Sequence, residues 1–165
     1  MQISFLKETF IHTVGQHQGI IHKVCRIYRD TVEDREDLFQ EILFQLWKAW
    51  PSFRDESRVA SWMYKVALST AVARYRKKQV LLQHGIKDEM APVPKEEEHP
   101  GKDRLYRAIS QLGDADKAIV ALYLDDYTYD EMADILGITV NHVGVKLSRI
   151  RNKLSQTLNP TKHGS

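Results

Sequence analysis

Apolar residues recur along this chain at the spacing of an α-helix, and neither half alternates apolar and polar residues as a strand does. The strongest pattern lies between residues 34 and 50, where an apolar face opposes an acidic and polar one. Weaker helical patterns follow at residues 58–78, 129–136 and 140–154. We therefore predict an all-α protein. The apolar face of the strongest pattern comprises Leu38, Phe39, Ile42, Leu43, Leu46, Trp47 and Trp50.

One aromatic residue of this segment, Phe44, lies off the apolar face and among polar residues. An aromatic ring on an acidic face can anchor a partner protein. Single exposed aromatic residues are nevertheless common on protein surfaces. The residues alone leave both interpretations open.

The prolines fall at boundaries, and residues 90–101 combine prolines and acids with almost no large apolar residue. Such a composition is typical of a linker. We therefore predict two small helical domains, at residues 1–80 and 103–165, joined by a flexible linker at 81–102.

A short polar loop at residues 53–58 precedes the second patterned segment, and Ser57 is predicted to cap the helix that follows. That helix interleaves Trp62 and Tyr64 with cations such as Lys65. Bases stack on aromatic rings at roughly 1–3 kcal/mol per base while cations contact phosphates, so the pattern is typical of a single-strand binding surface. The alternative is that both rings belong to the core, and for Trp62 the core is favoured.

The C-terminal half contains a helix-turn-helix pattern. Thr128 and Glu131 have the spacing of a capping box, Gly137 can turn the chain, and Thr139 can cap a second helix. Asp114 is predicted to cap the helix before them. Small Ala133 and apolar Val143 suit the close packing that this motif requires.

Cations gather at the end of each predicted domain. In the C-terminal domain, the cations after Asp134 form one cluster, and no acid follows Asp134. A second cluster lies at the end of the N-terminal domain. Two basic clusters suggest two contacts with one long polyanion, although cations also favour helix C-termini. The clusters comprise Lys146, Arg149, Arg151, Lys153 and Lys162, and Arg74, Arg76, Lys77 and Lys78.

Several function classes have no support in the sequence. The histidines lack metal-ligand spacing, and no phosphate loop or catalytic constellation is present, so we expect no enzyme activity, cofactor or metal. The single cysteine, Cys25, allows neither an intrachain disulfide nor a cysteine zinc site. No apolar run approaches the roughly 20 residues that span a bilayer. We expect a cytoplasmic protein.

The whole chain resembles a bacterial extracytoplasmic-function (ECF) sigma factor of the sigma-70 family. The resemblance rests on four stretches in the same order and at similar separations, at residues 36–47, 53–67, 127–138 and 140–151. It implies a protein that binds core RNA polymerase, recognises the −35 and −10 promoter elements and promotes melting.

The resemblance also implies site residues in the first domain. One set faces the clamp helices of the polymerase β′ subunit: Asp37, Gln40, Glu41 and Phe44. The other set handles the −10 element: Phe53, Arg54, Trp62, Lys65, Ser69, Arg74, Tyr75 and Lys78. Ser69 stands where the family has a base-handling asparagine. A serine hydroxyl offers one hydrogen-bond donor, whereas an asparagine amide offers a carbonyl acceptor and two donors.

In the second domain the resemblance implies a −35 recognition helix. Gly144 and Val145 stand where the family often has polar residues, so Val145 could contact thymine methyl groups. Further implied partners are the polymerase β flap and an anti-sigma factor, without obligate homo-oligomers. The implied residues are Asn141, His142, Gly144, Val145, Lys146, Ser148 and Arg149.

Two other readings compete with this one. A conventional helix-turn-helix regulator would have a sensing or dimerisation domain at its N-terminus and palindromic sites. A helical adaptor would use the acidic and aromatic face to bind a protein partner.

Overall fold

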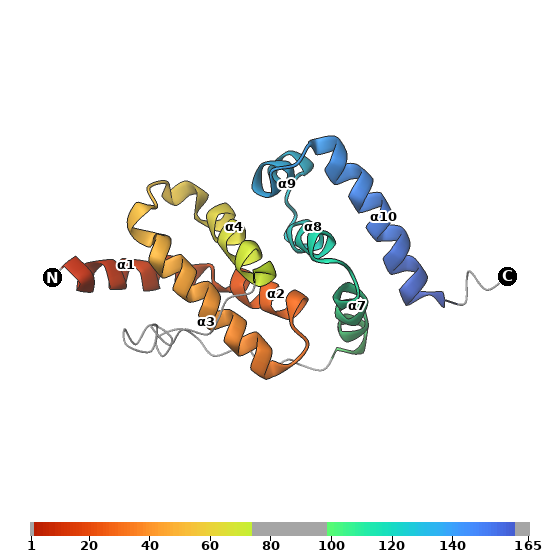
Figure 1. The fold of residues 1–165 in the computed structure, drawn as a ribbon, viewed down its shortest axis with the longest axis horizontal. Helices are drawn as coiled ribbons and strands as arrows, with labels where there is room; N and C mark the ends of the chain where they lie inside the picture. The colour runs from red at the N-terminus through yellow and green to blue at the C-terminus, as the bar shows by residue number, and fades with distance from the viewer. Residues whose placement is uncertain (1, 74–98, 161–165) are drawn as a thin grey trace. The chain divides into compact units, whose positions relative to one another are not determined.

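The computed structural model describes residues 2–73 and 99–160, and all regular structure in these ranges is helical (Figure 1). The chain divides into two compact units, between residues 95 and 96. The all-α prediction and its two helical domains are confirmed. Within the described ranges, none of the helices is both long and apolar enough to cross a membrane.

In unit 1, helices α2, α3 and α4 pack against one another, and α1 contacts α2 (Figure 1). Two 3₁₀ turns, η1 and η2, connect α3 to α4. The elements are α1 (Gln2–Gln16), α2 (Gln18–Tyr28), α3 (Val32–Ala49), η1 (Trp50–Ser52), η2 (Glu56–Arg58) and α4 (Val59–Val72).

The predicted apolar face of α3 forms the centre of this unit. Thr31 caps the helix, since its side chain accepts a 3.1 Å hydrogen bond from the Asp34 amide. The apolar positions are buried, except that Trp47 is half-buried with its ring edge-on to Phe10 at 5.2 Å. Burial of such a face stabilises the helix by roughly 1.5–3 kcal/mol for each large side chain.

In unit 2, the long helix α10 packs on α7, α8 and α9 (Figure 1). Its inner face consists of Val143, Leu147 and Ile150, all buried. The elements are α7 (Pro100–Ser110), α8 (Asp114–Leu124), α9 (Tyr129–Leu136) and α10 (Val140–Leu158).

Two boundaries in this unit differ from prediction. Helix α7 already begins at Pro100, inside the range assigned to the linker, because proline suits the first position of a helix. Gly113 is the N-cap of α8, and Asp114 is instead the first helical residue, where its charge favours the positive end of the helix dipole.

The turn between α9 and α10 follows the predicted local rules. The Thr128 side chain accepts from the Glu131 amide at 3.2 Å, and the Thr139 side chain accepts from the His142 amide at 3.0 Å. Gly137 ends α9 in the left-handed region at φ +68°, and the Ile138 amide donates to the Ala133 carbonyl. The two threonine caps and the left-handed glycine, Thr128, Thr139 and Gly137, therefore define the ends of the two helices and the turn between them.

Gly137 gives a first prediction. Gly137→Ala is expected to destabilise unit 2 by about 1–2 kcal/mol, because a Cβ disfavours positive φ and nothing else lies within 4 Å of the added atom. Gly101→Ala, on α7 of the same unit, is the matched control, since Gly101 lies outside the positive-φ region and has equally open surroundings. Chemical unfolding of both variants measures the difference, and equal stabilities would contradict the prediction.

Candidate polymerase and nucleic-acid interfaces

The candidate polymerase surface is a line of side chains on α3. Asp37, Gln40, Glu41 and Phe44 are three or four residues apart, so they share one side of the helix. All four are half-buried. Phe44, expected to be exposed, is therefore partly covered by its own unit. The surface combines two carboxylates with an aromatic ring, which suits a basic partner helix.

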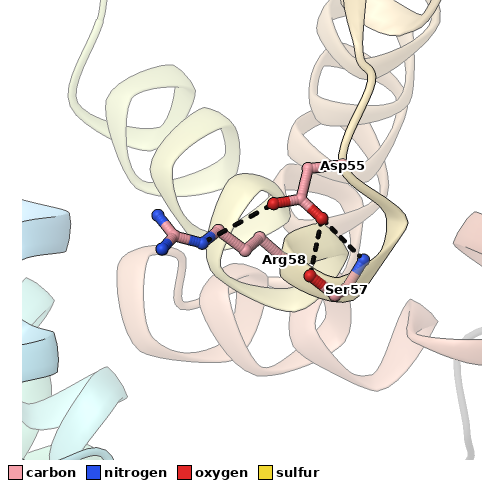
Figure 2. Close-up of polar contacts among 3 residues, drawn as sticks. All are labelled: Asp55, Ser57 and Arg58. Atoms are coloured by element: carbon pink, nitrogen blue, oxygen red, sulfur yellow. Dashed lines mark hydrogen bonds and ion pairs between the residues drawn. The ribbon is translucent and has the colours of Figure 1, made fainter.

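The loop before α4 is organised by Asp55 (Figure 2). Its Oδ1 accepts from the Ser57 amide at 3.1 Å and from the Ser57 hydroxyl at 2.6 Å. Its Oδ2 lies 3.7 Å from Nε of Arg58. The prediction that Ser57 caps α4 is wrong: Arg58 is the N-cap residue, without a side-chain cap bond, and the Ser57 hydroxyl donates to Asp55, just before the 3₁₀ turn η2.

These hydrogen bonds give a pH prediction. Donation from Ser57 lowers the pKa of Asp55 below its usual range. A carboxyl whose pKa is depressed by folding stabilises the folded loop above its unfolded pKa, and this contribution is lost as pH falls through the folded pKa. Ser57→Ala is expected to return the Asp55 pKa toward its ordinary value, as an NMR titration would measure. An unchanged pKa would contradict the assignment.

An aromatic stack lies beside this loop. The rings of Phe53 and Trp62 are 4.4 Å apart and 20° from parallel, and both residues are half-buried. Trp50, buried beneath them, lies 5.7 Å from Phe53 and 6.0 Å from Trp62. Trp62 therefore belongs neither wholly to the core nor wholly to the surface, and its stack with Phe53 lies next to the buried ring of Trp50.

The outer side of α4 presents Lys65 and Ser69, one turn apart and both exposed. The Ser69 hydroxyl donates to its own helix, at 2.8 Å from the Lys65 carbonyl and 3.1 Å from the Val66 carbonyl. Its lone pairs stay accessible as acceptors. Tyr64 is fully buried, so this ring is a core residue and not a stacking platform.

Of the remaining −10 candidates, the structure describes Arg54 alone. Arg54 is exposed and donates to the Pro51 carbonyl at 3.0 Å. Arg74, Tyr75 and Lys78 lie outside the described residues.

The candidate −35 surface lies on the first half of α10. Gly144 is half-buried, since a Cβ there would lie 3.7 Å from the Tyr129 ring, and Lys146 is half-buried in an ion pair 3.2 Å from Asp116 of α8. The two are thus on the flanks of the helix and not on its outermost side. The exposed members are Asn141, His142, Val145, Ser148 and Arg149.

Sequence reasoning missed the α8 residues that contact α10. Asp116 pairs with Lys146 across 30 residues, and the Tyr123 hydroxyl accepts from the Arg151 guanidinium at 2.8 Å. No local pattern marks either residue, because both contacts depend on how α8 packs under α10.

Other reactive side chains in the described ranges do not assemble a site. Burial raises the pKa of the Cys25 thiol to about 12, which keeps it protonated and inert. Across residues 2–73 and 99–160, no cluster of three His, Cys, Asp or Glu side chains could hold a metal ion.

Comparison with known proteins identifies both units. Residues 13–80 match the family model for Sigma-70 region 2, and residues 102–154 match the model for Sigma-70, region 4. The chain is 24% identical over 153 residues to the ECF RNA polymerase sigma factor SigM of Mycobacterium tuberculosis, covering 87% of this chain and 74% of SigM. It is 23% identical over 172 residues to the ECF RNA polymerase sigma factor SigW of Bacillus subtilis, covering 92% and 90%.

Two solved structures share the fold. The sigma factor RpoE, in complex with the anti-sigma factor NepR from Bartonella quintana, superposes with a TM-score of 0.65 at 17% identity, covering 92% of this chain and 96% of RpoE. CnrH, in complex with the cytosolic domain of CnrY, gives 0.63 at 19% identity, covering 93% and 90%. With both regions matched in order, the chain belongs to the sigma-70 family and is an ECF RNA polymerase sigma factor.

Proposed function

We propose that this sigma factor docks on core RNA polymerase through the α3 surface, recognises the −35 element with α10 and the −10 element with α4 and its preceding loop, and promotes melting between them. The single observation that supports this best is the first half of α10, which has exposed polar side chains and follows directly on the Gly137 turn and the Thr139 cap. The polymerase β′ clamp helices are the proposed partner of α3, and the β flap that of unit 2.

The chemistry of α10 suits duplex DNA. Asn141 offers an amide, His142 an imidazole and Val145 two methyl groups, all on exposed side chains near the start of the helix. Such groups can hydrogen-bond base edges or contact thymine methyls in a major groove. The helix contains no acid, and exposed Arg149 is one turn beyond Val145, where a phosphate contact would fix the register.

The chemistry of unit 1 suits an unpaired strand. The Phe53 and Trp62 stack presents partly exposed rings beside Arg54, while Lys65 and Ser69 follow on α4. A base that leaves the duplex could stack on such rings while a cation contacts its phosphate. Melting is then favoured because the unpaired strand is bound more tightly than the duplex.

Two weak contacts become strong when they are linked. Docking on polymerase would fix the separation of the two units, so that the second DNA contact becomes intramolecular and gains effective concentration. Release would need both contacts to open. We propose that an anti-sigma factor in the cytoplasm prevents this docking, since the structurally similar RpoE is bound by one, and that the factor acts without forming an obligate homo-oligomer.

Transcription by core polymerase on a fragmented-genome template, with and without this protein, tests the proposal. New 5′ ends that share two upstream motifs at a fixed separation are expected. If no new starts appear while the same polymerase is active with another sigma factor, the promoter-recognition proposal fails. A stable dimer on palindromic DNA would then favour a conventional regulator.

The α3 surface gives a separate prediction. Glu41→Arg is expected to weaken core polymerase binding by tenfold or more, because reversing a charge at a complementary interface costs roughly 2–5 kcal/mol. Glu8→Arg, at an exposed position of α1, is the matched charge reversal and is expected to bind normally. Equilibrium binding to labelled core polymerase measures both, and equal affinities would place the interface elsewhere.

A further inference from the structure

Two cations of α10, half-buried Lys146 and exposed Arg151, contact side chains of α8. Nζ of Lys146 lies 3.2 Å from Oδ1 of Asp116, and only about a quarter of each side chain is exposed, 27% and 22%. Arg151 donates to the Tyr123 hydroxyl at 2.8 Å and lies over the same ring, 5.2 Å from its centroid.

The two contacts hold different flanks of α10. Lys146 and Arg151 are five residues apart, which places them about 140° apart around the helix. Asp116 and Tyr123 are seven residues apart, so they are about 10 Å apart along α8. The inner residues Val143, Leu147 and Ile150 lie between these flanks and are buried. Helix α8 thus packs against α10 and contacts one side chain on each flank of its buried face.

We infer that Asp116 and Tyr123 are positioning residues for promoter recognition, which hold Lys146 and Arg151 and so set the angle at which α10 presents its base-facing side chains. This inference rests on the proposed function of α10. It assigns Lys146 to α8 instead of a DNA phosphate. Drawing Lys146 out to a phosphate would leave the three-quarters-covered Asp116 carboxylate without its cation, which is unfavourable.

The direction in which Asp116→Asn changes promoter affinity distinguishes a phosphate contact by Lys146 from a positioning role of Asp116. If Lys146 contacts a phosphate, Asp116→Asn frees it, removes a negative charge near DNA and tightens binding. If Asp116 positions α10, the same substitution weakens binding to the correct sequence despite the more favourable charge. Asp134→Asn, at an exposed acid of α9, is the matched control for charge alone.

The salt dependence of promoter binding also distinguishes a cation that contacts a phosphate from one that positions α10. Each phosphate that a cation neutralises adds about one unit to the slope of log affinity against log salt. A positioning cation adds nothing to this slope. Arg149→Met, at an exposed cation on the same helix, shows the slope change that loss of a phosphate contact produces.

The experiment measures holoenzyme binding to a mapped promoter, and to the same promoter with an altered −35 motif, across a range of salt. Asp116→Asn and Lys146→Met are each expected to weaken binding to the correct promoter about three- to tenfold, leave binding to the altered promoter and the salt slope unchanged, and together cost no more than either alone. Tyr123→Phe is expected to have a smaller effect of the same kind. Asp134→Asn is expected to bind equally well or more tightly.

Tighter binding by Asp116→Asn, or a lower salt slope with Lys146→Met, would overturn the inference. Equal losses on both promoters with a lowered unfolding temperature would also overturn it, as they indicate a purely structural role. A wild-type holoenzyme that does not distinguish the two promoters would instead overturn the proposed function of α10.

Discussion

Arg149→Ala is expected to lower transcription from mapped promoters by about tenfold or more while core polymerase binding stays unchanged. The side chain is exposed on the outer side of α10, four residues beyond Val145 and away from the buried inner face. Loss of one hydrogen bond to a charged phosphate costs roughly 1.5–3 kcal/mol. Run-off transcription at saturating polymerase measures the first quantity, and equilibrium binding of the variant to core polymerase measures the second.

Lys65→Ala is a useful comparison because it also removes an exposed cation, but from unit 1. On a template that ends between the two motifs, so that no −35 DNA is present, wild-type activity is already reduced and Arg149→Ala should cost nothing further, whereas Lys65→Ala should keep its full effect. If Arg149→Ala reduces core binding as much as transcription, the residue belongs to the polymerase interface.

Trp62→Ala is expected to reduce formation of open complexes on duplex promoters by about tenfold or more. The substitution removes the 4.4 Å stack with Phe53 and uncovers Trp50 below it. An aromatic pair contributes about 0.5–1.5 kcal/mol beyond its buried area, and stacking of one base contributes roughly 1–3 kcal/mol. Permanganate reactivity of unpaired thymines measures the open fraction.

Trp62→Phe keeps an aromatic ring on Phe53 and is expected to retain most of the activity. A template with a pre-melted −10 region should rescue Trp62→Ala in part, because the cost of opening is then already met while the stacking contact is still missing. Equal defects on duplex and pre-melted templates, with unit 1 unfolded at a lower temperature, would show that Trp62 serves stability alone.

Local patterns predicted the parts of the fold that depend on neighbouring residues. The apolar face of α3, the threonine caps at Thr128 and Thr139 and the turn at Gly137 all follow from spacing within a few residues. Such features are determined by helix periodicity and by backbone groups at helix ends. The turn of the helix-turn-helix could therefore be located from the sequence to the residue.

Features that depend on packing could not be predicted in this way. The sequence presents Lys146 as one more cation of a basic helix, and only the position of α8 reveals its pair with Asp116. Tyr64 and Trp62 are two residues apart in α4, yet Tyr64 is fully buried and Trp62 is half-buried against the rings of Phe53 and Trp50. Ser57 is not the N-cap because it lies inside the 3₁₀ turn η2, which ends at Arg58, and its hydroxyl donates to Asp55 instead of accepting from an α4 amide.

Site-specific photo-crosslinking in the open promoter complex tests the central claim most directly. A crosslinker in place of exposed Val145 in unit 2 and, separately, one in place of exposed Ser69 in unit 1 would be activated on the same promoter. We expect the first to react with duplex DNA at the upstream motif and the second with the unpaired strand at the downstream motif. Reaction of both at one motif, or of neither with DNA, would contradict the two-site account.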